Sequence, residues 1–297
     1  MLSALSIAVA LLLVGYLLRK SGRLPDNAAE TLNRFVIDIC VPATILRLVP
    51  TLTFTPSLAV LVIVPWALVG LAYLTARAAS RWLGLDRPTT TALFLMTGLS
   101  NTSFLGFPLC SALLGERSLP LAAVYDQLGS FLLLGTVAPV ALARVTAGER
   151  PRPAAVARRI LSFPPLIALI VALLPLPRPA LVEPLLATAS APLVPVAMVA
   201  VGLKLRLTPP RPIGVLVLGL ALKLAAFPAV ALLLARALGA PPLVKQVATL
   251  ESAMPTMVSA GALMMAYGVA SDLAAAFVGW GLVISLGTVP LWAALLR

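Results

Sequence analysis

The chain contains ten apolar segments, most of which approach the ~20 residues that a helix needs to cross a bilayer. Hydrophobic residues make up 61% of the 297 positions and charged residues only 11%, and the mean hydropathy is +1.06. These values are typical of polytopic helical membrane proteins and exclude an ordinary soluble domain. We therefore expect an all-α polytopic membrane protein with ten transmembrane helices. Their approximate limits are 2–18, 31–50, 57–77, 89–114, 119–143, 160–176, 180–203, 213–236, 243–267 and 272–296.

The distribution of basic residues predicts the orientation. Lys and Arg gather in the loops that follow odd-numbered segments, where Arg19, Lys20, Arg77, Arg87 and Arg144 lie. Because cytoplasmic loops carry the excess of Lys and Arg, both termini should face outward. The net charge of +12 is spread over short loops, which argues against nucleic-acid binding. We expect a multi-pass protein of the cell (inner) membrane, surrounded by the lipid bilayer.

The two halves of the chain resemble each other. Val41-Pro42 matches Val194-Pro195, and Gly135-Thr-Val137 matches Gly287-Thr-Val289, in the same order. Each half holds five segments, and because five is odd the second copy enters the membrane from the opposite face. The sequence thus predicts a 5+5 inverted repeat. Its parts are a first repeat over residues 1–143, a cytoplasmic link over 144–159 and a second repeat over 160–297.

Pro and small polar residues interrupt the fourth and ninth segments in mid-span, over Thr97–Pro108 and Thr249–Thr256. Proline lacks a backbone donor and clashes with the preceding helical turn. In lipid, freed backbone groups are tolerated only where they line protein or a watery cavity. Broken helices at matching positions in two halves indicate a transporter with its substrate site near the membrane midplane.

These interruptions carry a family resemblance. Asn101-Thr-Ser-Phe-Leu-Gly-Phe-Pro108 resembles the N-T-G-F-L-G-x-P motif of the auxin efflux carrier family, and Val124-Tyr-Asp126 resembles the V-L-Y-D segment that follows it. Leu250–Pro255, Tyr267-Gly268 and Thr288–Pro290 resemble the C-terminal signature of that family. The family includes bacterial malate and malonate permease-like proteins and the plant PIN-type auxin carriers.

The resemblance implies two crossed broken helices, similar to those of bile-acid symporters and sodium/proton antiporters. It also implies a scaffold domain of segments 1, 2, 6 and 7 and a transport domain of segments 3–5 and 8–10. A homodimer, elevator-type alternating access and small organic anions as substrates are further implications. Ser103 stands where the family usually has Gly, which would narrow or polarise the pocket.

Asn101 is the leading candidate for substrate binding. A neutral amide at a helix break donates to a carboxylate without the desolvation cost of a buried ammonium group. The alternative is that Asn101 only caps a half-helix. Ser100, Thr102 and Ser103 are further candidate donors, beside a half-helix N-terminus whose dipole favours anions.

Two prolines are expected at the breaks. Pro108 and Pro255 would each keep a helix open and leave backbone groups facing the substrate. An ordinary kink is the alternative in a chain with 27 prolines. Gly106 is expected to permit close backbone approach at the first break. Thr256 is a candidate hydroxyl donor beside the second break.

Four charged residues fall within apolar segments, where each costs at least ~2.5–3.5 kcal/mol at a helix centre. Glu251 and Asp126 are candidate carriers of a coupling proton. Lys223 is expected either to neutralise an acid or to attract an anionic substrate, and Asp38 is assigned to the scaffold. A structural ion pair or a water-facing position is the alternative for all four.

The preferred function is secondary transport of small organic anions such as malate, malonate or auxin-like acids. The alternative is a sodium-coupled organic anion symporter of the bile-acid type, with Na⁺ held by Glu251, Ser100, Asn101 and unwound carbonyls. Coupling to H⁺ or Na⁺, uniport, import and export all stay open. The chain has no His, and Cys40 and Cys110 both lie in apolar stretches. We therefore expect no metal site, no cofactor and no enzymatic activity.

Overall fold

The fold is described by a computed structural model for residues 2–53, 55–146, 153–174, 179, 181–205, 207 and 212–296. These residues form helices joined by turns, and their only β-type pairing is an isolated bridge. The all-α class is thereby confirmed. Of the predicted link over 144–159, residues 147–152 lie outside the described residues.

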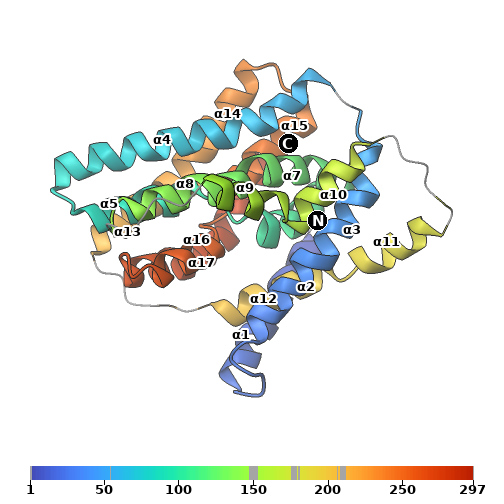
Figure 1. Cartoon of the computed structure of the whole chain (residues 1–297), viewed down its shortest axis with the longest axis horizontal. Helices are drawn as coiled ribbons and strands as arrows, with labels where there is room; N and C mark the ends of the chain where they lie inside the picture. Colours follow the sequence, from blue (N-terminus) through green and yellow to red (C-terminus); the bar gives the residue numbers. More distant parts are fainter. Residues whose placement is uncertain are drawn as a thin grey trace.

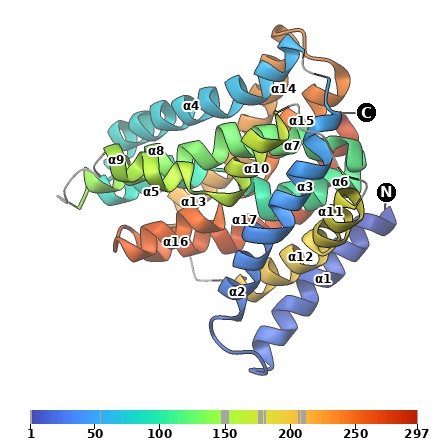
Figure 2. The same ribbon diagram turned by 45° about the vertical axis from the view of Figure 1, so that its right-hand side comes forward.

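Six helices form what we call the small bundle: α3 and α11 lie on the right of Figure 1 and α1, α2 and α12 at its bottom, and Figure 2 shows them after a turn of the molecule. Within it, α1 packs along α12, and α3 packs against both α10 and α11. A π-helical turn, η1 (Val36–Cys40), joins α2 to α3, and the 3-10 turn η2 (Val49–Thr51) follows α3. The helices are α1 (Leu2–Lys20), α2 (Ala28–Phe35), α3 (Val41–Leu48), α10 (Pro164–Ala172), α11 (Val182–Ser190) and α12 (Leu193–Lys204).

The remaining helices, apart from α9 (Pro153–Leu161), form the large bundle, in which α4 packs on α5, α14 on α15 and α16 on α17. Short 3-10 or π turns connect several of them, and α9 packs against α8 and α10. The helices are α4 (Val60–Leu83), α5 (Arg87–Gly98), α6 (Phe107–Leu114), α7 (Leu119–Tyr125), α8 (Leu132–Ala143), α13 (Ile213–Ala221), α14 (Phe227–Ala237), α15 (Pro242–Ala253), α16 (Val258–Ala266) and α17 (Ser271–Leu295). The turns are η3 (Pro56–Ala59), η4 (Thr102–Gly106), η5 (Glu116–Ser118), η6 (Asp126–Phe131) and η7 (Leu222–Ala226).

Several elements join end to end into helices of membrane length. Within the described residues, five helices are long and apolar enough to cross a membrane, and they coincide with the third, fifth, seventh, eighth and tenth predicted segments. Their limits are Pro56–Leu83, Glu116–Ala143, Val182–Lys204, Ile213–Ala237 and Ser271–Leu295. The other predicted segments correspond to α1, α2–α3, α5–α6, α10 and α15–α16. The arrangement of ten crossings in a 5+5 repeat stays a prediction.

Local sequence sets the turn between α4 and α5. Gly84 ends α4 in the left-handed region at φ 64°, where glycine has no Cβ to clash. Asp86 then caps α5, because its Oδ1 accepts the Thr89 N–H at 2.9 Å. Pro88 occupies the first turn, where its missing N–H costs no helical hydrogen bond. The two helices therefore return side by side.

Two glycines bring α1 and α12 into backbone contact. A Cβ added at Gly202 would lie 2.0 Å from the carbonyl oxygen of Leu12, and one at Gly15 would lie 2.2 Å from that of Val199. Small residues allow membrane helices to approach this closely and to gain dispersion contacts. The α1–α12 pair is thus tightly packed within the small bundle.

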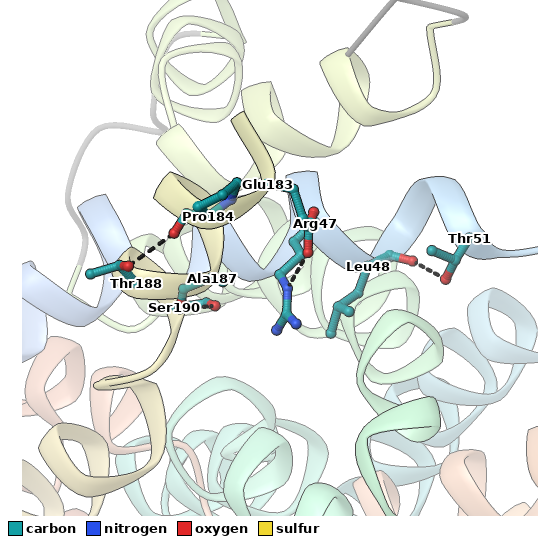
Figure 3. Close-up of polar contacts among 8 residues, drawn as sticks. All are labelled: Arg47, Leu48, Thr51, Glu183, Pro184, Ala187, Thr188 and Ser190. Carbon is teal, nitrogen blue, oxygen red and sulfur yellow. Dashed lines mark hydrogen bonds and ion pairs between the residues drawn. The ribbon is translucent and has the colours of Figure 1, made fainter. Parts of the chain in front are cut away.

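An ion pair links two other helices of the small bundle. Arg47 Nε on α3 lies 2.8 Å from Glu183 Oε1 on α11, as Figure 3 shows. Both side chains keep solvent exposure, so the pair contributes at most about 1 kcal/mol. Nearby hydroxyls donate to carbonyls of their own helices or turns: Thr51 to Leu48, Thr188 to Pro184 and Ser190 to Ala187.

Candidate functional site

Both interrupted segments fold as two helices separated by a non-helical stretch. In the first, α5 ends at Gly98 and η4 begins at Thr102. In the second, α15 ends at Ala253 and α16 begins at Val258. The segments are therefore broken, as the sequence predicts, and Pro255 lies within the second break.

Pro108 and Gly106 do not lie at the first break, and the expectation that they mark it is wrong. Both belong to the helix that follows, since η4 runs into α6 at Phe107. The Gly106 N–H donates to the Asn101 carbonyl, five residues earlier, at 3.1 Å. This wider π-type turn precedes Pro108, whose ring would clash with a carbonyl of a regular helix. The chain absorbs the proline as a bulge, and the break falls before it.

Backbone hydrogen bonds join the two breaks. The Asn101 N–H donates to the Pro255 carbonyl at 2.9 Å, and the Met257 N–H donates to the Leu99 carbonyl at 3.0 Å. Between them, Ser100 and Thr256 form an antiparallel bridge. We call the two paired stretches, residues 99–101 and 254–257, the crossing. Because all of them are buried, these bonds satisfy backbone groups that lipid could not.

Side chains from outside each helix satisfy carbonyls at its broken end. The Thr256 hydroxyl donates to the Met96 carbonyl, in the last turn of α5, at 2.7 Å. The Lys223 ammonium group, on η7 and 1% exposed, donates to the Ser252 carbonyl near the end of α15 at 3.2 Å and also to the Ser100 hydroxyl. A cation at a helix C-terminus complements the partial negative charge of the last carbonyls. Lys223 therefore acts on the crossing directly.

Asp126 accepts hydrogen bonds, through its carboxylate group, from polar groups that follow the first break. It begins η6, is 1% exposed, and accepts hydrogen bonds from the Thr102 hydroxyl, the Ser103 hydroxyl at 2.7 Å and the Gln127 amide at 2.5 Å. Hydrogen bonds to an ionised acceptor are the strongest of the common types. The hydroxyls of Thr102 and Ser103 are thus engaged inside the protein.

Glu251 lies behind the first half-helix, on α15, and is fully buried. Its carboxyl group fills the space left by the missing side chain of Gly106, since a Cβ there would lie 2.1 Å from Oε2. The Cys110 thiol donates to Oε1 at 3.4 Å, and Oε2 has no hydrogen-bond partner among the described residues. Gly106 therefore permits close approach, as expected, but to a side chain rather than to a break.

A cavity of about 220 Å³ lies between the two bundles beside the crossing. On one side, the large bundle and the crossing contribute Asn101, Ser103, Phe104, Asp126, Phe131, Leu134, Met257 and Ser259. On the other side, the small bundle contributes Ile37, Val41 and Pro165, together with Phe163, which lies just before α10. The Asn101 Nδ2 is buried and has no partner among the described residues. Because buried donors are nearly always paired, this unpaired donor in the cavity wall requires an explanation.

Some of the predicted site residues line the cavity and others do not. Asn101, Ser103 and Asp126 line the cavity. The side chains of Ser100, Thr102 and Thr256 are hydrogen-bonded within the protein, Lys223 contacts the crossing, and Glu251 lies behind it. Asp38 is exposed on η1 and belongs to none of these contacts.

Sequence reasoning missed Gln127 and Ser259. Gln127 donates to Asp126, and its buried Oε1 has no partner in the described part of the chain. A second polar residue beside an intramembrane Asp was the available signal. Ser259 lines the cavity two residues after the second break, in the first turn of α16. Among the described residues, no group of three or more His, Cys, Asp or Glu side chains is arranged to hold a metal ion.

Apolar helices of membrane length, two breaks joined by backbone hydrogen bonds and a buried cavity beside them define the class of multi-pass helical membrane transporters. Comparison with known proteins gives the family. The sequence model of the family described as membrane transport protein, the auxin efflux carrier family, matches residues 2–155 and 154–293. The chain belongs to this family.

Two relatives are described as uncharacterized transporters. The chain is 28% identical to one from Methanothermobacter thermautotrophicus, over 99% of this chain and 97% of that protein. It is 31% identical to one from Methanocaldococcus jannaschii, over 54% of this chain and 52% of that protein. The family that the sequence motifs predict is therefore confirmed, and it is a family of membrane transporters.

Proposed function

We propose that the protein is a secondary transporter of small organic anions that binds its substrate in the cavity beside the crossing. The observation that carries this proposal is the buried Asn101 side chain, which lines the cavity and whose Nδ2 has no partner among the described residues. A carboxylate of the substrate would accept from it and from half-helix N–H groups. A cavity of about 220 Å³ suits a small acid better than a bulky one.

The charges around the cavity support coupling to protons. Asp126 lines the same cavity, and Glu251 is buried nearby on α15, whereas Lys223 is the basic residue that contacts the crossing. An entering anion would add a further negative charge to a water-poor site, where like charges repel strongly. Uptake of a proton by Asp126 together with the anion would keep the site close to neutral.

Sodium coupling is the alternative, and Lys223 argues against it. Its ammonium group already donates hydrogen bonds to the Ser100 hydroxyl and the Ser252 carbonyl, which are oxygen atoms that a sodium ion would need as ligands. The fixed ammonium group takes the place of a mobile cation at this point of the crossing. Uptake measured with an imposed sodium gradient and with an imposed proton gradient distinguishes the two kinds of coupling.

Alternating access would move the large bundle, with the crossing, against the small bundle. Two features support this elevator-type motion: the cavity is walled by both bundles, and Gly15 and Gly202 hold α1 and α12 together in the small one. The small bundle would then be the scaffold domain and the site of homodimer contacts, and the large bundle the transport domain.

The test is uptake of malate, malonate and indole-3-acetate by proteoliposomes that contain the purified protein. We expect Asn101→Ala to reduce uptake roughly 10- to 100-fold, the effect of losing one hydrogen bond to a charged group worth about 1.5–3 kcal/mol. Asn33→Ala is the matched control, because Asn33 is a buried amide on α2 outside the cavity. Unchanged uptake in Asn101→Ala, or no uptake of any of these acids by the wild type, would overturn the proposal.

A further inference from the structure

A second and larger cavity, of about 890 Å³, lies away from the crossing between α4, α5 and α8. Figures 1 and 2 show these three helices side by side. Its walls include Trp66, Val69, Gly70, Phe94 and Val137, and the lining shares no residue with the cavity that holds Asn101. The proposed transport function makes no use of it.

Three arginines line one end of this cavity. Arg77 lies toward the C-terminus of α4, Arg87 is the first residue of α5, and Arg144 follows the last residue of α8. All three are exposed, and none makes an ion pair within the described residues. The neighbouring carboxylate of Asp86 is used to cap α5. No Asp or Glu belongs to the lining, so the cavity presents three positive charges without an ion-pair partner among the described residues.

The lining becomes apolar along the same helices. Trp66 precedes Arg77 by eleven residues on α4, so the two residues lie roughly 16 Å apart along the helix axis. That length is about half of the ~30 Å hydrocarbon core, which is the depth of one leaflet. Trp66 and Tyr73 face the cavity and are each more than 40% exposed, as is typical of aromatic residues that contact lipid. A charged end and an apolar end one leaflet apart match an amphiphile with an anionic head.

We propose that the cavity between α4, α5 and α8 binds an anionic phospholipid, with the headgroup phosphate on Arg77, Arg87 and Arg144 and an acyl chain along Trp66, Gly70 and Phe94. The basic end lies in loops that follow odd-numbered segments, which the charge distribution assigns to the cytoplasmic side. Anionic lipids of that leaflet attract basic pockets between membrane helices. Bidentate contacts between guanidinium groups and a phosphate give the site its preference for the charged head.

The test uses full-length protein in detergent, with dioleoyl phosphatidylglycerol, dioleoyl phosphatidylcholine and inorganic phosphate as separate probes. We expect phosphatidylglycerol to remain bound in native mass spectra and to raise the unfolding temperature, and the other two probes to do neither. The triple variant Arg77→Gln, Arg87→Gln, Arg144→Gln should lose both effects. Its matched control is Arg23→Gln, Arg81→Gln, Arg158→Gln, which removes three exposed arginines outside the lining and should keep them.

A second variant tests the apolar end without changing charge. A Cβ at Gly70 meets no atom within 4 Å, so Gly70→Leu adds a side chain to a wall of the cavity from a position with room for its Cβ. We expect it to weaken retention of phosphatidylglycerol at least fivefold, whereas Gly214→Leu, equally free of contacts but outside the lining, should not. Equal losses in the two triple variants, a thermal shift from inorganic phosphate alone, or equal retention of both lipids would overturn the proposal.

Discussion

Thr256 ties the second break to the end of α5, and its role differs from the one that the sequence suggests. Its hydroxyl is buried and donates to the Met96 carbonyl, so it stabilises the crossing rather than facing the cavity. Ser100 and Thr102 are likewise used inside the protein, by Lys223 and Asp126. At the residue scale, this leaves the Asn101 amide as the unpartnered donor among the predicted polar side chains that line the cavity.

Replacing Thr256 by Val should destabilise the protein by about 1–3 kcal/mol, because the shape is kept and a buried carbonyl loses its donor. Thr256→Ser keeps the hydroxyl and should cost less. Thermal unfolding of the purified variants measures the difference. Thr188→Val is the control, since the Thr188 hydroxyl donates to the Pro184 carbonyl on an exposed surface. Equal unfolding temperatures for Thr256→Val and wild type would contradict the assigned bond.

Asp126→Asn should abolish uptake driven by a proton gradient, because the amide cannot take up a proton with the anion. Exchange of labelled for unlabelled substrate, which needs no net proton movement, should persist at a reduced rate. Asp38→Asn changes an exposed acid on η1 and should retain gradient-driven uptake. Full proton-driven uptake in Asp126→Asn would remove this residue from coupling.

The position of Asn101 beside the first break could be predicted from the sequence, because an amide within an interrupted apolar segment either caps a half-helix or serves a polar site. Its neighbours' partners could not be found, since the bonds from Ser103 to Asp126 and from Thr256 to Met96 join positions far apart in the chain. Such contacts depend on how helices pack, and no local pattern records that packing. The sequence therefore predicts which residues gather near the site more reliably than which of them face the cavity.

At the scale of the helix, the first interrupted segment shows how position changes the effect of a proline. The sequence predicts a break near Pro108, yet the chain breaks at residues 99–101 and stays helical from Thr102 to Leu114. A π-type turn before Pro108 accommodates its ring, and a sequence pattern does not reveal that widening. In the second segment Pro255 does lie in the break, where its carbonyl accepts the Asn101 N–H.

The backbone contact between α1 and α12 gives a prediction for the small bundle. Gly202→Ala places a Cβ 2.0 Å from the Leu12 carbonyl oxygen, so the two helices must separate. We expect a loss of about 1–3 kcal/mol, the usual cost of overpacking, seen as a lower unfolding temperature. Gly214→Ala adds a methyl group where nothing lies within 4 Å and should leave the temperature unchanged or raise it. Matching temperatures for the two variants would show that this contact is not tight.

On the scale of the whole molecule, the described helices follow the ten predicted segments, whereas five of them meet the length and composition of a membrane-spanning helix on their own. The others are broken, short or joined to polar turns. Periodicity and hydropathy identify apolar segments, but they do not show how far each half of a broken helix extends across the bilayer. The number of crossings therefore needs a test of sidedness.

Labelling of single introduced cysteines in intact cells provides that test. With ten crossings and outward termini, Glu116→Cys and Pro241→Cys should react with a membrane-impermeant thiol reagent, whereas Ser21→Cys and Thr146→Cys should react only after permeabilisation. All four positions are exposed, and the native Cys40 and Cys110 are buried, so the wild-type protein is the blank. Reaction of all four from the same side would contradict the inverted arrangement.

Main-chain atoms alone make two of the hydrogen bonds that link the breaks: the Asn101 N–H with the Pro255 carbonyl, and the Met257 N–H with the Leu99 carbonyl. No replacement of a side chain deletes those donors, except a proline at one of the two amide positions. Residues that line the cavity, such as Ser103, Phe131 or Ser259, can therefore be replaced without removing the backbone hydrogen bonds between the two broken helices. Under the proposed function, substitutions of wall residues would change the substrate that the protein carries, while the main-chain link between its half-helices is kept.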